Sequence, residues 1–273
     1  MPDPSRERVL QYYTDTDEAA RLRTTWFQLE HERTRELIRR HLPPPPARII
    51  DAGGASGVYA CWLASLGHEV HLIDPVSKHV EQARAASSQQ PDHPLASAEV
   101  GDARQLPSSK NPFDAVLLLG PLYHLVKKEE RIACLREARR VLRPGGLIWG
   151  AGISRFASLL DSISNGFFTD PEFAPILERD LEDGQHRNPT TNSIYFTDAY
   201  FHKPGELSRE FLAAGFQVLE IAAIEGPGWL ARDFDRLWEN PPQRERLLDV
   251  LRKVEHEPSI VGASSHIMAI GRK

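Results

Sequence analysis

Cysteine is nearly absent from this chain of 273 residues, in which only Cys61 and Cys134 occur. Both fall within expected helices, and neither belongs to a CxxC pair or to any other spacing typical of metal ligands. The sequence therefore predicts neither a disulfide framework nor a metal site. A reduced, cytoplasmic protein is the simplest interpretation of this cysteine content.

Long apolar runs and an excess of basic residues are missing as well. The apolar run of the strongest strand, residues 115–119, is far too short to span a bilayer, so we expect no membrane partner. The formal net charge of −5 gives no electrostatic footprint for nucleic acid. The basic run of Arg33, Arg35, Arg39 and Arg40 is interpreted as the solvated face of a helix.

Apolar and amphipathic segments alternate along the chain, and 41% of the residues are hydrophobic, enough for a substantial core. Strands are expected at 48–51, 69–73, 98–100, 113–119, 147–150, 216–224 and 265–270. Helices are expected at 18–41, 58–66, 77–87, 128–141, 204–214 and 233–256, the last broken at Pro241-Pro242. This order predicts an α/β fold with a Rossmann-like, doubly wound, seven-stranded sheet, mostly parallel with an antiparallel last strand.

The most informative segment is Ile49-Ile50-Asp51-Ala52-Gly53-Gly54-Ala55-Ser56-Gly57. It reads as a buried strand that ends in an acid, followed by a glycine-rich turn and a helix; the second strand also ends in an acid, Asp74. A dinucleotide-binding turn has no need of an acid before its glycines. A carboxylate there instead attracts a cation, such as the amino-acid part of S-adenosylmethionine (SAM).

Four polar or small residues follow predicted strand ends: Asp51, Asp74, Asp102 and Gly120. In a parallel sheet, ligands bind outside the carboxyl ends of the strands, where the strand order reverses. One fold rule therefore brings these four residues together, and this convergence is a stronger signal than any single motif.

The glycine segment resembles the D-x-G-x-G-x-G motif of class I SAM-dependent methyltransferases, within the UbiE/COQ5-like small-molecule group. The resemblance covers about residues 48–150 and returns in the final strands. Ala55 stands where the motif has its middle glycine, which is acceptable if its φ is negative. The resemblance implies SAM as cofactor and a small-molecule acceptor that is methylated on an O or N atom.

Cofactor-binding roles follow from the resemblance residue by residue. Asp74 is expected to accept both ribose hydroxyls, with a helix cap as the alternative, and Asp102 to contact the adenine amino group, with a turn residue as the alternative. The implied cofactor-binding residues are Asp51, Gly53, Gly54, Gly57, Asp74, Asp102, Ala103, Gly120 and, from the N-terminal segment, Tyr13.

The acceptor side is predicted from fewer signals. His124, after the fourth strand, and His202 are candidate catalytic bases, since a histidine with a pKa near neutrality can take the acceptor's proton. Tyr123, Tyr200 and Glu225 are candidate substrate-binding residues. Plain packing is the alternative for all five.

The resemblance and the patterning together divide the chain into four parts. These are an N-terminal helical lid (1–46), a SAM-binding core (47–152), a cap insertion (153–203) and the C-terminal part of the core (204–273). The insertion is irregular, rich in aromatic residues and too long for an ordinary loop, so we expect it to cover the acceptor pocket.

Other functions remain open at this point. A nucleic-acid or protein methyltransferase is one alternative, and a SAM-binding module without transfer activity is another. An NAD-dependent dehydrogenase is more distant because Asp51 precedes the glycines. The sequence identifies neither the acceptor nor the oligomeric state. Asn240-Pro241-Pro242-Gln243 superficially resembles a motif of amino-methylating enzymes, but it does not follow the fourth strand and is interpreted as a helix break.

Overall fold

The computed structural model describes residues 4–107, 111–190 and 192–273. Residues 1–3 and 191, which belong to the predicted lid and cap, lie outside this part. A nine-stranded sheet forms the centre of the described structure. Its strands are β1 (Arg48–Ala52), β2 (Glu69–Asp74), β3 (Ser97–Val100), β4 (Phe113–Leu118), β5 (Leu142–Ser154), β6 (Gln185–His186), β7 (Ala199–His202), β8 (Gln217–Ala223) and β9 (His266–Arg272).

The sheet has the predicted doubly wound topology. Strands β3, β2, β1, β4 and β5 lie side by side and are parallel. The last strand, β9, is antiparallel to both β5 and β8, as expected. The strand order reverses between β1 and β4, which places the expected ligand site at their carboxyl ends.

The sheet has two more strands than the seven expected. Strand β5 continues to Ser154, and its end pairs in parallel with β7 through Ile153 and Phe201. Strand β7 in turn pairs with the short β6. Part of the predicted cap therefore extends the main sheet.

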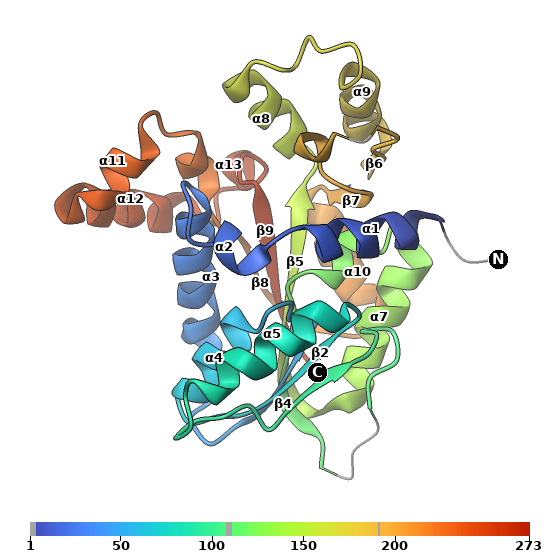
Figure 1. Ribbon diagram of the computed structural model, residues 1–273, viewed down its shortest axis with the longest axis vertical. Helices are drawn as coiled ribbons and strands as arrows, with labels where there is room; N and C mark the ends of the chain where they lie inside the picture. The colour runs from blue at the N-terminus through green and yellow to red at the C-terminus, as the bar shows by residue number, and fades with distance from the viewer. Residues whose placement is uncertain (1–3, 108–110, 191) are drawn as a thin grey trace.

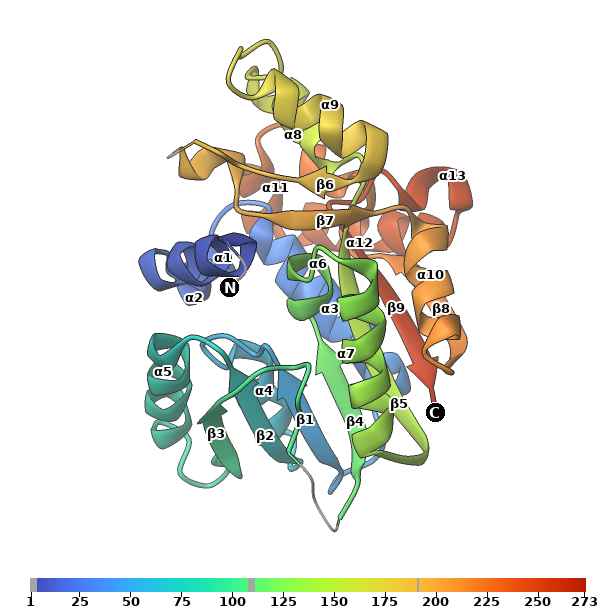
Figure 2. The ribbon, with the colours of Figure 1, turned by 90° about the vertical axis from the view of Figure 1, so that its right-hand side faces the viewer.

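Helices cover both faces of the sheet (Figures 1 and 2). One apolar core joins α3 (Phe27–His41), α4 (Val58–Ser65) and α5 (Ser77–Ser88) to one face, and a second joins α7 (Lys128–Val141) and α10 (Pro204–Ala213) to the other. The remaining helices are α1 (Pro4–Asp15), α2 (Glu18–Arg21), α6 (Pro121–His124), α8 (Ala157–Asn165), α9 (Ala174–Asp183), α11 (Phe234–Glu239), α12 (Pro241–Val254) and α13 (Pro258–Val261), with 3₁₀ turns at Ser193–Tyr195 and Gly226–Leu230.

The N-terminal segment differs from its prediction. The single helix expected at 18–41 is split into α2 and α3, because the chain turns between them with Thr25 at a φ of 44°. An additional helix, α1, precedes them. In both views α1 crosses between the carboxyl ends of the strands and the cap segment that contains β6 and β7 (Figures 1 and 2).

The basic run on α3 is not wholly solvated, contrary to its interpretation from sequence. Arg33 is fully buried, where its guanidinium donates to the Ile224 carbonyl at 3.2 Å and pairs with Glu255. Arg40 reaches the same Glu255 carboxylate. These contacts fasten α3 to the C-terminal part of the chain.

The break before Pro241 is confirmed, since α11 ends at Glu239 and Asn240 caps α12 by accepting from the Gln243 amide. Cys61 and Cys134 are both free thiols. In the described ranges, every helix is too short or too polar to cross a membrane.

Candidate active site

A cavity of about 210 Å³ opens at the carboxyl ends of β1, β2 and β4, and we call it the strand-end cavity. Nearly all of the predicted cofactor-binding residues line it, namely Asp51, Gly53, Gly54, Asp74, Asp102, Ala103, Gly120 and Tyr13. Gly57 does not; it is the N-cap of α4, with a φ of 83°. The topological argument therefore located the cavity correctly.

The glycine turn brings backbone close to the cavity. A Cβ on Gly53 would lie 2.6 Å from Pro121 Cγ, and a Cβ on Gly54 would lie 2.8 Å from the Asp51 carboxyl carbon. Ala55 has a φ of 47°, so the condition given above for accommodating an alanine at this position, a negative φ, is not met. This left-handed conformation directs the Ala55 amide toward Asp74 Oδ2, to which it donates at 2.9 Å.

Asp51 is the least compensated charge in the cavity. The residue is 1% exposed, and its Oδ2 has no hydrogen-bond partner among the described residues. Burial, together with the nearby Asp74, raises the pKa of Asp51 to about 7. A buried carboxylate without a counter-ion fits a cationic ligand group, and the ammonium of SAM is such a group.

Asp74, the last residue of β2, is held by residues that follow it. Its Oδ1 accepts from the Val76 amide at 2.9 Å and lies 3.1 Å from Nδ1 of His79, a cavity residue that the sequence patterns did not indicate. The carboxylate still lines the cavity and retains acceptor capacity. It thus fits the predicted pairing with ribose hydroxyls.

The carboxylate of Asp102 already accepts hydrogen bonds from two arginines. Arg104 binds it through Nε and Nη2, and Arg6 of α1 reaches it at 2.7 Å. Although burial opposes ionisation, the hydrogen bonds from Arg104 hold the pKa of Asp102 below its usual value. An adenine amino group would have to share this carboxylate with Arg6 or displace it.

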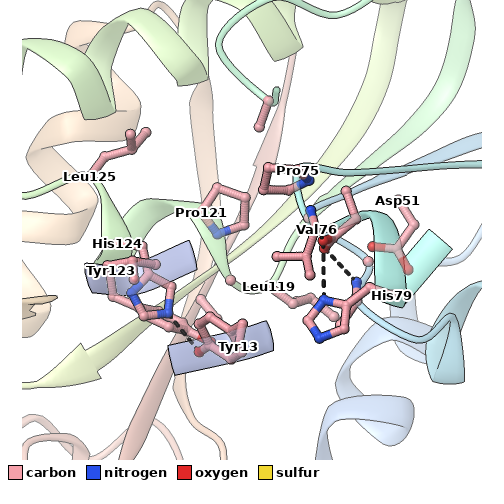
Figure 3. Close-up of a pocket in the computed structure, with 18 of the residues that line it drawn as sticks. Tyr13, Asp51, Pro75, Val76, His79, Leu119, Pro121, Tyr123, His124 and Leu125 are labelled. Atoms are coloured by element: carbon pink, nitrogen blue, oxygen red, sulfur yellow. Dashed lines mark hydrogen bonds and ion pairs between the residues drawn. The ribbon is translucent and has the colours of Figure 1, made fainter. Parts of the chain in front are cut away.

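Helix α1 is fastened across the strand-end cavity. Ser5 and Arg8 donate to the buried carboxylate of Asp198 at 2.7 and 2.5 Å, and Lys78 donates to the Thr14 carbonyl. The Tyr13 hydroxyl lies 2.7 Å from His124 Nε2. Figure 3 shows this pair with Tyr123 on one side of the pocket, and Asp51 and His79 on the other.

His124 is less suited to act as a base than predicted. Its Nδ1 lies 3.2 Å from the Asp198 carbonyl, which can only accept, so Nδ1 carries the proton and Nε2 accepts from Tyr13. Burial lowers the pKa of His124 to about 4, well below the near-neutral value expected. Both ring nitrogens are engaged, and the residue joins α1 to α6.

A second cavity, of about 220 Å³, lies beneath the predicted cap, and we call it the aromatic cavity. It shares four lining residues with the strand-end cavity: Tyr13, Arg21, Tyr123 and His266. Most of its other walls are apolar or aromatic side chains, including Tyr12, Trp26, Phe27, Ile153, Ala157, Phe167, Phe173, Tyr195, Phe196, Phe201 and Trp229.

Three predicted acceptor-side residues line neither cavity in the described structure. His202 is wholly buried beside Glu210, and burial lowers its pKa. Tyr200 stacks on the Arg131 guanidinium at 3.7 Å. Glu225 is buried and binds His266, whose Nδ1 is 2.7 Å from Glu225 Oε1. Local packing and ion pairs therefore account for all three positions.

Sequence reasoning missed His266, although it lines both cavities. A signal for it was present. Because the last strand is antiparallel to its neighbours, its first residue, not its last, lies at the carboxyl edge of the parallel strands. His266 is that first residue and pairs in register with Ile153 near the end of β5.

Comparisons with known proteins agree with this geometry. Residues 49–146 match the protein family described as Methyltransferase domain. The ubiquinone biosynthesis O-methyltransferase of Xanthomonas campestris pv. campestris (strain B100) is 26% identical over 243 residues, which are 85% of this chain and 92% of the relative.

Solved structures with this fold include a SAM-dependent methyltransferase from Methanosarcina mazei, with a TM-score of 0.57 and 18% identity, covering 87% of this chain and 96% of the other. Another is the S-adenosylmethionine-dependent methyltransferase from Mesorhizobium loti, with a TM-score of 0.58 and 17% identity, covering 90% and 100%. These structures support the fold, while the domain match and the curated relatives support the activity. The chain is a methyltransferase that uses SAM as its cofactor, and it is similar to the curated ubiquinone biosynthesis O-methyltransferases.

Proposed function

We propose that this enzyme transfers the methyl group of SAM to an O or N atom of a small molecule held in the aromatic cavity. The observation that carries the proposal is the junction of the two cavities at Tyr13, Arg21, Tyr123 and His266. A cofactor in one cavity and an acceptor in the other would meet there. The curated O-methyltransferase relatives favour an oxygen acceptor.

Asp51 would bind the ammonium group of the cofactor, and Asp74 would bind its ribose. Asp102 would bind the adenine ring, with the Ala103 amide beside that ring. When bound, SAM supplies a methyl group on a sulfonium, which is already a good leaving group. The protein's task is therefore to align the acceptor for in-line displacement and to exclude water.

The lid and cap of the predicted domain organisation belong to this proposal. Helix α1 is tied to the cap through Asp198 and to the core through Asp102 and His124. Phe196, held at a φ of 64°, packs its ring against Tyr12 and His124. Lid and cap would together seal both cavities during transfer, and α1 would have to move to admit SAM.

The test is a screen with methyl-labelled SAM against phenols, alcohols and amines, followed by mass spectrometry of the products. We expect label in a small-molecule product with the wild-type protein and none with Asp51→Asn. Label found only in protein or RNA would favour the alternative methyltransferases. SAM binding without any transfer would favour a binding module.

A further inference from the structure

We propose that His266 is the general base of the methyl transfer and that it deprotonates a phenolic hydroxyl of an acceptor in the aromatic cavity, with Glu225 as its positioning residue. This inference rests on the proposed function and deepens it. It names the proton acceptor and the chemical class of the substrate.

The geometry fixes one tautomer of His266. Glu225 is fully buried and accepts from the Ser264 hydroxyl at 2.8 Å and from the His266 amide at 2.9 Å. Its other oxygen is 2.7 Å from His266 Nδ1, so Nδ1 carries a proton and Nε2 is left as the acceptor. Within the described ranges, Nε2 of His266 has no hydrogen-bond partner, whereas both ring nitrogens of His124 have one.

Charged groups from several elements face this histidine. Glu30 of α3 lies beside it and is paired with Arg21 of α2 at 2.7 Å, while the Tyr123 ring of α6 is 6.2 Å away. Burial alone would lower the pKa of His266, but the charges of Glu30 and Glu225 outweigh burial and raise it. His266 is thus a stronger base than an ordinary histidine, and it becomes available as the pH rises through this elevated pKa.

The aromatic cavity favours an uncharged ring over an ammonium ion. Its walls suit the faces and edges of an aromatic acceptor. Two of its charged residues are already paired, Arg21 with Glu30 and His186 with Asp180 at 2.8 Å. Burial raises the pKa of Asp161, another lining carboxyl, which weakens it as a partner for a cation.

The need for a base also favours a hydroxyl acceptor. A neutral amine attacks without prior loss of a proton, whereas a hydroxyl must give one up. In the proposed step the hydroxyl proton moves to His266 Nε2 as the O–C bond forms and the C–S bond breaks. The sulfur keeps the electron pair and becomes a neutral thioether, and His266 then returns its proton to solvent.

The test compares two phenols of similar size and different acidity, 4-methylphenol and 4-nitrophenol, at mildly alkaline pH. General-base assistance is worth about 10²–10⁴-fold, so His266→Ala should slow methylation of 4-methylphenol by about that factor. The loss should be far smaller for 4-nitrophenol, which is already ionised, and calorimetric SAM affinity should be unchanged. His256→Ala is the matched control, because His256 forms a similar pair with Glu220 at 2.7 Å on the surface.

A second variant separates positioning from folding. Glu225→Gln should shift the rising limb of the pH–rate profile to lower pH and slow turnover, and Glu225→Asp should restore part of the rate. Equal losses of rate with the two phenols in His266→Ala would overturn the assignment of the base. A rising limb of the pH–rate profile that does not shift in Glu225→Gln would overturn it as well. So would activity that is abolished by EDTA and restored by Mg²⁺ or Zn²⁺, because Glu30, Glu225 and His266 would then act on a metal.

Failure of the inference is distinguishable from failure of the proposed function. A wild-type protein that methylates amines but neither phenol overturns the acceptor class proposed here, while small-molecule transfer stands. A wild-type protein that methylates no small molecule at all overturns the proposed function itself.

Discussion

The strand-end cavity and the aromatic cavity adjoin each other but are built in different ways. The first takes its predicted ligand-binding groups from the ends of four neighbouring strands and from a glycine turn, so the backbone fold dictates its shape. The second takes most of its walls from side chains of the cap, while α1 contributes to both cavities. Under the proposed function, the sheet topology would therefore set the cofactor site, and the segments added around the sheet would set the acceptor site.

The two regions also differ in how their charges are balanced. In the strand-end cavity, Asp51 has no counter-ion within the described structure. In the aromatic cavity, His186 is paired with Asp180, and Arg21 and His266, which line both cavities, are each paired with a carboxylate as well. The strand-end cavity, with its unpaired carboxyl, and the aromatic cavity, with these paired charges, should therefore respond differently to mutation and to changes in pH.

The largest effect is expected at Asp74, on the cofactor side. Asp74→Ala removes the acceptor of two predicted charge-assisted hydrogen bonds from the ribose, worth roughly 2–4 kcal/mol. Calorimetry should show SAM affinity reduced by well over tenfold, with circular dichroism confirming that the variant is folded. Asp92→Ala, in an exposed turn, is the control, and unchanged affinity in Asp74→Ala would remove this residue from the cofactor site.

Asp51→Asn should weaken SAM binding and yet stabilise the free protein. The pKa of Asp51 is raised from 3.8 to about 7 by folding, so ionisation destabilises the folded state as the pH rises toward and through 7. Removing that charge should therefore increase the free energy of unfolding at pH 8 by about 2–4 kcal/mol. Denaturant titration of the ligand-free variant that shows a loss of stability would contradict the account of Asp51.

The same carboxyl predicts a pH dependence of cofactor affinity in the wild type. Below about pH 7, Asp51 must lose a proton before it can pair with the ammonium of SAM, so affinity should fall as the pH decreases from 7 to 5.5. In Asp51→Asn this part of the pH dependence should vanish. Calorimetry in buffers of different ionisation enthalpy will show whether a proton is released on binding.

A smaller effect is expected where lid and core meet. Tyr13→Phe removes the hydroxyl that donates to His124 Nε2 and leaves that nitrogen without its partner, at a cost of about 1–2 kcal/mol. The lid should open more easily, so stopped-flow measurements should show SAM dissociating several-fold faster. Gln11→Ala, on the exposed side of α1, serves as the control, and equal dissociation rates would rule out a lid role for this pair.

The smallest effect is expected in the cap. Peptides from 153–203 should exchange amide hydrogen more slowly when both S-adenosylhomocysteine and an acceptor are bound than when either is bound alone. The reason is that cap side chains form much of the wall of the aromatic cavity. Protection that no ligand alters would mark the segment as a remote structural element.

The lining of the strand-end cavity was predictable because it depends on strand order and on residues that lie at or directly after strand ends. The prediction that Asp51, Asp74 and Asp102 lie together required only the alternation of strands and helices and one topological rule. The aromatic cavity was not predictable in the same way. Residues 153–203 carry no simple periodicity, so neither the pairing of β7 with β5 nor the burial of His202 can be read from them. The position of His266 at the site could have been predicted, but only by combining the antiparallel direction of the last strand with the residue at which that strand begins.

The most direct test of the central claim is a crystal structure with S-adenosylhomocysteine bound. The account predicts its ammonium at Asp51, its ribose hydroxyls at Asp74, and its sulfur facing the opening between the two cavities at Tyr123 and His266. A sulfur directed away from these two residues, or an adenine ring occupying the aromatic cavity, would contradict it.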